Sequence, residues 1–177
     1  MSDYNNFYNT FFETFESIEF CLNKNYVIPA LCLIYSGIDS IAWVAYGDIN
    51  VKDRFVKFVQ DHMYAEKPLA PKPIDLYAAR CAILHTMTPD SRLSNNNQAV
   101  RICYAYGEAD LKDLQDSIQK LNPGAFSAVH INDLGKSFRL GVAHFIENDG
   151  ENTDCTARMQ KHYAQLSSDI VKIFNET

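Results

Sequence analysis

The stretch PALCLIYSGIDSIAWVAY, residues 29–46, carries apolar side chains at steps of three and four, which predicts a helix. This apolar stripe consists of Leu31, Ile34, Ile38, Ile41 and Ala45. Pro29 suits the first turn of a helix and Gly47 suits its exit. Small and polar residues interrupt the stretch, and Asp39 is the charged one among them. A helix this apolar must be covered by others, so the stretch predicts a helical bundle.

The flanking sequence supplies the covering helices. Comparable stripes predict helices over about residues 7–22, 51–64, 74–87, 111–121, 134–146 and 159–173. The first carries Phe7, Phe11 and Phe15 on one face, which must be covered. Asn132 or Asp133 can cap the helix that follows them. Together these segments predict one bundle of about six longer helices.

Two segments break the helical pattern. Residues 100–106 alternate apolar and other side chains, which predicts a strand, and residues 126–131 predict a second one. We expect the two strands to pair, while the sequence leaves their direction open. The fold class is therefore mainly α: a single domain over residues 1–177, with a small two-stranded β-containing insertion at about 99–131.

Composition excludes some classes of protein. The chain has 177 residues, of which 47% are apolar and 21% charged, as in an ordinary soluble globular domain. Its formal net charge is −6, from 16 basic and 22 acidic residues. This balance argues against a general polyanion binder, which normally carries a basic face and a high pI. A local basic site is still compatible with it.

The cysteines and the apolar runs bear on location. The five cysteines form no C-x-x-C pair, so we expect free thiols, mostly buried, in a reducing cytoplasm. The N-terminus has no basic segment typical of a signal peptide. The longest uninterrupted apolar run, residues 27–34, is too short to span a bilayer. We therefore expect a cytoplasmic protein with no membrane partner.

The segment LYAARCAILHT, residues 76–86, holds the strongest candidate site. Arg80 and His85 lie five positions apart on a mostly apolar helix, a rotation of about 140°. Both can reach a shared cleft if His85 lies in the fraying last turn. An arginine in such a helix needs a carboxylate, a carbonyl or a ligand anion as partner. The structural alternative is an ion pair with Asp39 or Asp75.

Three further residues support this candidate site. Asp39 is either an orienting partner for Arg80 or His85 or a partly exposed polar residue. Tyr77 either stacks on a nucleic acid base or packs in the core, and packing is favoured. Cys81 follows the arginine directly, where it is either part of the site or a plain core residue.

The Arg80-x4-His85 pair, late in a helical bundle, resembles the R-x(4–6)-H motif of the HEPN superfamily. An aromatic first helix and a second helix with small and acidic residues resemble that superfamily too. The resemblance covers roughly residues 5–90 and the closing helices, and it makes the segment 99–131 an insertion. Many HEPN members have a polar residue after the motif arginine, where this chain has Cys81.

The resemblance implies a function as well as a fold. Catalytic HEPN proteins are metal-independent endoribonucleases, and most are dimers whose motif helices face each other. It thus implies a homodimer that cleaves RNA, with Arg80 on the phosphate and His85 as acid or base towards the 2′-hydroxyl. It also implies an inhibitor protein as a partner in some members. The alternative is a non-catalytic HEPN-like interaction or assembly module.

The remaining motifs predict neither a cofactor nor a metal site. No pair of histidines has zinc-site spacing with a third ligand, and no phosphate-binding loop or nucleophile elbow is present. His62 and His162 are expected at the surface, and His130 and His144 are expected to be structural or exposed. A metabolic enzyme or small-ligand binder is the least favoured class.

Overall fold

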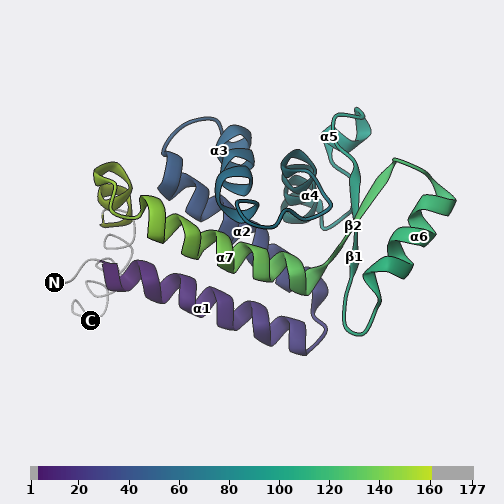
Figure 1. The fold of residues 1–177 in the computed structure, drawn as a ribbon, viewed down its shortest axis with the longest axis horizontal. Coiled ribbons are helices and arrows are strands. Elements are labelled where there is room, and N and C mark those ends of the chain that lie inside the picture. The colour runs from purple at the N-terminus through teal and green to yellow at the C-terminus, as the bar shows by residue number, and fades with distance from the viewer. Residues whose placement is uncertain (1–3, 161–177) are drawn as a thin grey trace, which may run out of the picture.

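The computed structural model describes residues 4–160, and Figure 1 shows their arrangement. It is mainly helical with one two-stranded sheet, as the sequence predicts. In chain order the elements are α1 (Tyr4–Asn23), α2 (Val27–Tyr46), α3 (Val51–Phe58), the π-helical turn η1 (Val59–Met63), α4 (Pro73–Thr86), α5 (Arg92–Asn95), β1 (Arg101–Ala105), α6 (Leu111–Leu121), β2 (Phe126–His130) and α7 (Ile131–Asp149).

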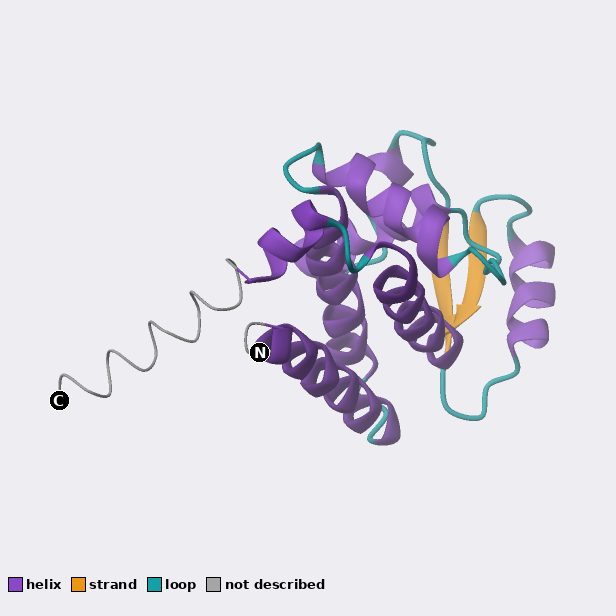
Figure 2. Ribbon diagram, turned by 60° about the vertical axis from the view of Figure 1, so that its left-hand side comes forward, coloured by secondary structure: helices purple, strands orange, loops and turns teal. Residues whose placement is uncertain are grey.

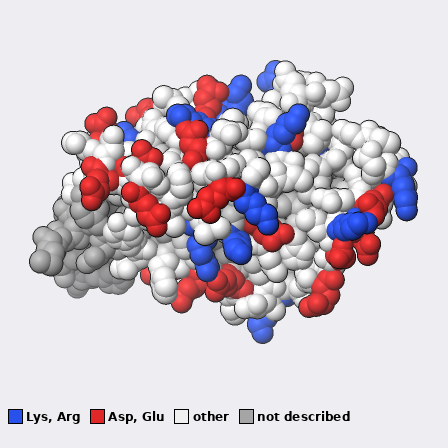
Figure 3. Space-filling model, in the orientation of Figure 1, with Lys and Arg blue, Asp and Glu red and all other residues white. Residues whose placement is uncertain are grey.

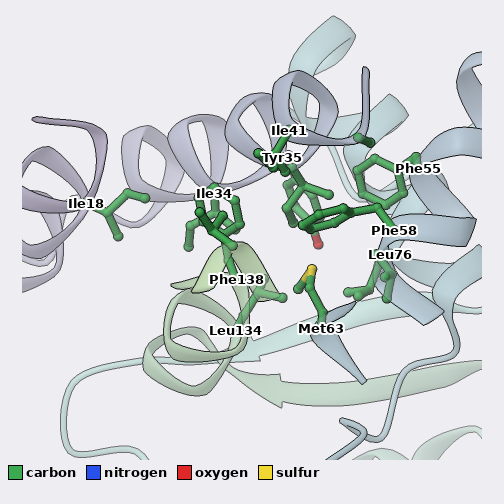
Figure 4. Packing of buried hydrophobic residues seen from close by; sticks show 14 of the residues in the cluster. Ile18, Ile34, Tyr35, Ile41, Phe55, Phe58, Met63, Leu76, Leu134 and Phe138 are labelled. Carbon is green, nitrogen blue, oxygen red and sulfur yellow. The ribbon is translucent and has the colours of Figure 1, made fainter. Parts of the chain in front are cut away.

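Helix α2 lies at the centre of the bundle. It packs against α1, α3, α4 and α7, and its predicted stripe is buried except for the half-buried Ala45. Figure 4 shows Ile34, Tyr35 and Ile41 of α2 facing Phe58 and Phe138 across the core. Burying one such side chain contributes about 1.5–3 kcal/mol relative to leaving it in water. The central stripe therefore accounts for much of the stability of the fold.

The two strands form a parallel sheet, with Arg101 opposite Phe126 and Ala105 opposite His130. Parallel strands need a crossover connection, and α6 provides it (Figure 2). The sheet is tied to the bundle at its buried side, where the hydroxyls of Tyr104 and Tyr35 lie 2.6 Å apart. The predicted pairing of the two strands is thus confirmed, and their direction, which the sequence left open, is parallel.

Three predicted element boundaries differ from the structure. Helix α2 begins at Val27, two residues before Pro29, which still lies in the first turn where backbone N–H groups have no partner within the helix. The predicted helix over 51–64 is α-helical only to Phe58 and continues as η1. Helix α7 begins at Ile131, and its cap is His130, whose Nδ1 accepts a hydrogen bond from the Asn132 amide at 3.2 Å.

The end of the chain is described only in part. Residues 153–160 are helical, and Met159 is buried, as the predicted last stripe requires. The other residues of that stripe, from Tyr163 to Ile173, lie outside the described residues. The prediction of a long terminal helix therefore stays a prediction.

Helix α2 is long and apolar enough to cross a membrane by length and composition alone. Half of its 18-residue apolar window is buried inside the protein, and the expectation of a cytoplasmic protein without a membrane partner stays a prediction. All five cysteines are unpaired, as predicted, but only Cys155 is fully buried. The expectation that most are buried is wrong, because the other four are only half-buried.

Candidate functional site

The arginine of the predicted motif is held by an ion pair between two helices. Arg80 of α4 donates to Oδ2 of Asp39 on α2, from Nε at 2.7 Å and also from Nη2. Both side chains are only 16% exposed. Burial opposes the charge on Arg80, but the attraction of Asp39 outweighs it, so the pKa of the guanidinium is raised. Arg80 is therefore a fixed cation at the α2–α4 boundary.

His85 lies next to this cation at the end of α4. Its Nε2 is 3.4 Å from Nη1 of Arg80, and the imidazole is exposed to solvent. A guanidinium can only donate, so in this contact Nε2 carries the lone pair and accepts. The long arginine side chain thus bridges the rotation of about 140° that separates the two positions on the helix.

The two supporting residues of α4 flank the same pair. Tyr77 is half-buried and packs edge-on against Phe55, with ring centroids 5.6 Å apart. Burial raises the pKa of the Tyr77 hydroxyl, and the neighbouring Cys81 raises it further. The favoured reading of Tyr77 as a packing residue agrees with this position. The structure therefore brings Asp39, Tyr77, Arg80, Cys81 and His85 to one place.

The second carboxylate considered as a partner for Arg80 has another role. Asp75 Oδ2 accepts from the Lys72 amide and Oδ1 from the Val100 amide, both at 2.9 Å. Asp75 thus caps α4 and fastens the chain that enters β1. Asp39 keeps one oxygen unused: its Oδ1 is buried and has no hydrogen-bond partner among the described residues.

Two polar segments near the site have structural roles. Ser91 and Arg92 follow Pro89-Asp90, a stretch whose residues suit either a phosphate contact or a capped turn, and the structure has the capped turn: Ser91 caps the short helix α5 by accepting from the Ser94 amide. The helical pattern of residues 51–64 predicts that Arg54 is solvated on the outer face of α3, but it is half-buried, and its Nε has no partner among the described residues. Lys57 is exposed and pairs with Asp61. Within residues 4–160, no hydrogen bond or ion pair joins any of these side chains to Arg80 or His85.

The main correction concerns His62, which is buried rather than at the surface. It packs against Phe58 and Phe145, contacts Tyr46 and lies against His144. A signal for this was present in the sequence. His62 follows Phe55, Phe58 and Val59 at the spacing of one helix face, and that face is the buried one.

Charge and metal-binding geometry limit what the described surface can bind. Acidic and basic side chains are interspersed over the face drawn in Figure 3. Within residues 4–160, no group of three or more His, Cys, Asp or Glu side chains is arranged to hold a metal ion. The fold and the site together define a mainly helical protein with an ion-paired arginine beside an exposed histidine. Comparison with protein-family models, curated proteins and solved structures gave no match to this chain.

Proposed function

We propose that the chain is a HEPN-like endoribonuclease that cleaves RNA through the ribose 2′-hydroxyl without a metal. The observation that supports this is the approach of Arg80 Nη1 to His85 Nε2, at 3.4 Å, with the imidazole open to solvent. A fixed cation beside an exposed acid–base group is the pair that phosphodiester transfer needs.

Each side chain of the site has a separate role in this proposal. Arg80 uses Nε and Nη2 on Asp39, so Nη1, which contacts His85 Nε2 in the free protein, is the nitrogen that would turn to donate to a phosphate oxygen when RNA binds. That movement would free the lone pair on Nε2 of a neutral His85 to accept the proton of the 2′-hydroxyl as that oxygen attacks the phosphorus. The 5′-oxygen then leaves with a proton and the RNA strand ends in a 2′,3′-cyclic phosphate. Asp39 positions Arg80 and does not contact the substrate.

A homodimer would complete this site. One histidine cannot donate and accept a proton at the same moment, so a second copy that faces the first would provide the acid for the leaving oxygen. Two Arg80 side chains would also double the positive charge at the scissile phosphate. We expect a homodimer in solution, which size-exclusion chromatography with light scattering would test.

The test of cleavage uses pure protein and a mixed-sequence RNA in EDTA. The parent should produce fragments with cyclic phosphate ends, and His85→Ala should lower the rate by about 10²–10⁴-fold. Arg80→Lys keeps the charge but loses the fork that pairs with Asp39, so we expect it to be impaired as well. Arg92→Ala, an exposed arginine on α5, is the matched control and should cleave like the parent.

One observation favours the alternative of a non-catalytic interaction module. Arg80 and Asp39 join α4 to α2 and are mostly covered, which is what a purely structural tie requires. The cleavage experiment separates the two functions. If folded parent protein leaves all RNA intact, or if His85→Ala cleaves at the parental rate, the nuclease proposal is wrong and the module is favoured.

A further inference from the structure

A second polar site lies away from Arg80 and His85, in a cavity of about 490 Å³. Its walls come from the end of α2, from α3 and η1, from the end of α7 and from residues 152–158. The polar side chains that line it include Tyr46, Lys57, Asp61, His144, Asp149 and Arg158. A volume of this size lies within the range of small-molecule sites.

A chain of hydrogen bonds runs along one wall of the cavity. It determines which ring nitrogen of His62 and which of His144 carries the proton. Tyr46 donates its hydroxyl proton to Asp61 Oδ2 at 3.0 Å, so its oxygen accepts from His62 Nε2, also at 3.0 Å. His62 then carries its proton on Nε2 and has a lone pair on Nδ1. That lone pair faces His144 Nδ1 at 3.1 Å, so His144 is the donor there. The neutral His144 is left with an unprotonated Nε2.

The π-helical turn puts the middle of this chain in place. Asp61 and His62 are consecutive residues of η1, and both reach the wall of the cavity. Gly141 of α7 allows the close contact, because a Cβ there would lie 3.1 Å from the Cα of Met63. Single π-helical turns are frequent at functional sites. The π-helical turn therefore directs the Asp61 carboxylate and the His62 imidazole into the same chain of hydrogen bonds.

The charges that line the cavity leave acceptors rather than donors. Lys57 is paired with Asp61, and the Arg158 guanidinium donates to the carbonyls of Val44 and Ala45 at 2.7 and 3.0 Å. Asp149 is 54% exposed, and its nearest ionisable partner among the described residues is His62, 3.9 Å away. His144 Nε2 and the exposed carboxylates of Asp149 and Asp154 therefore remain to receive hydrogen bonds from a ligand, and Asp149 lies on the same helix as His144.

We propose that this cavity binds an aliphatic amine in its ammonium form. An ammonium group offers three donors and no acceptor, which matches an imidazole lone pair and an exposed carboxylate that line the same cavity. Asp149 balances the charge, and His144, held by the chain through His62 and Tyr46, fixes the direction of the amine. The interaction is binding alone, and it does not depend on the RNA-cleaving function.

The experiment follows the histidine rings of the full chain by NMR, with ¹⁵N-labelled histidine. Putrescine is the probe, 1,4-butanediol is the uncharged molecule of equal length, and magnesium and zinc ions are added in separate titrations. We expect putrescine to cause a saturable shift of the His144 resonances, with butanediol causing none. A response to butanediol equal to that of putrescine, a response to metal ions alone, or no saturable response would overturn the proposal.

Two variants test the assigned contacts. Asp149→Asn should weaken putrescine binding by about tenfold, since it removes a charge-assisted hydrogen bond. Glu147→Gln loses the same charge from an exposed position of the same helix and should bind like the parent. Tyr46→Phe should let His62 and His144 populate both tautomers, visible in their ¹⁵N shifts. Parental affinity in Asp149→Asn would contradict the assignment even if Tyr46→Phe failed to fold.

Discussion

The two carboxylate oxygens of Asp39 lie in different surroundings. Oδ2 accepts two hydrogen bonds from Arg80, whereas Oδ1 is buried and accepts none from the described residues. A buried acceptor without a partner lowers the free energy of unfolding, whereas a charge-assisted hydrogen bond to an arginine raises it. The net contribution of Asp39 therefore rests on the single oxygen that faces Arg80.

Asp39→Asn tests how much that oxygen contributes. The amide loses the negative charge, so Arg80 becomes a mostly covered cation without its counter-charge. We expect the free energy of unfolding to fall by about 1–3 kcal/mol, measured by urea denaturation. Asp53→Asn, at an exposed carboxylate that is 62% accessible, should change it by no more than about 0.5 kcal/mol. Equal effects from the two variants would show that the Arg80 pair has no stabilising role.

At this scale the sequence predicted the members of the candidate site but not the connections between them. Asp39, Tyr77, Arg80, Cys81 and His85 do lie together, because helical spacing places the last four on one element. The choice of Asp39 over Asp75 depends on how α2 crosses α4. No local pattern carries that information, so the sequence leaves both partners open.

At the scale of elements, two glycines of α7 make a matched pair. A Cβ on Gly141 would lie 2.6 Å from Met63 Cγ and 3.1 Å from its Cα, so backbone would have to move. We expect Gly141→Ala to lower the unfolding free energy by about 1–3 kcal/mol. A Cβ on Gly135 meets nothing nearer than 3.7 Å, so Gly135→Ala should raise it by up to about 1 kcal/mol. Thermal unfolding of both variants measures the contrast, and a neutral Gly141→Ala would mean that α7 and η1 pack more loosely.

The turn η1 also predicts how stability depends on pH. Burial lowers the pKa of His62 below its usual value, so the unfolded chain binds a proton that the folded chain does not. Stability from this group is complete above the unfolded pKa of about 6.5 and is lost as the pH falls below it. Urea denaturation between pH 7.5 and pH 5 should show this loss, with pH values chosen around that pKa. His62→Phe should flatten the slope, and an unchanged slope would assign the effect to other groups.

The spacing of apolar residues predicts some of the elements more fully than others. The long helices were predicted within a few residues because their apolar stripes continue to their ends. The π-helical turn was missed because one extra residue per turn leaves the stripe of Phe55, Val59 and Met63 looking helical. Strand direction was not predictable either, since both directions bury the same alternate residues. The prediction that His62 lies at the surface is wrong because it rests on the polarity of histidine. The helix face that His62 shares with Phe55, Phe58 and Val59 is buried.

At the scale of the whole molecule, stability is unevenly distributed. Helix α2 carries nine buried residues among its 20, whereas α6 has none and packs mainly against the two strands. Few buried contacts mean that α6 opens at low cost. Native-state hydrogen exchange should find the amides of α6 among the fastest of the helical amides and those of α2 the slowest. Equal protection in both helices would show that the insertion and the bundle unfold as one unit.

The hydrogen bond between the hydroxyls of Tyr35 and Tyr104 connects β1 to α2, the helix that carries Asp39. Tyr35 lies one helical turn before Asp39 on α2, so a tilt of the sheet would pull directly on the segment that anchors Arg80. The strand residue Tyr104 is thus linked to the Arg80–Asp39 ion pair through Tyr35 and one turn of α2. Tyr104→Phe removes this hydrogen bond between sheet and bundle and should leave the ion pair in place.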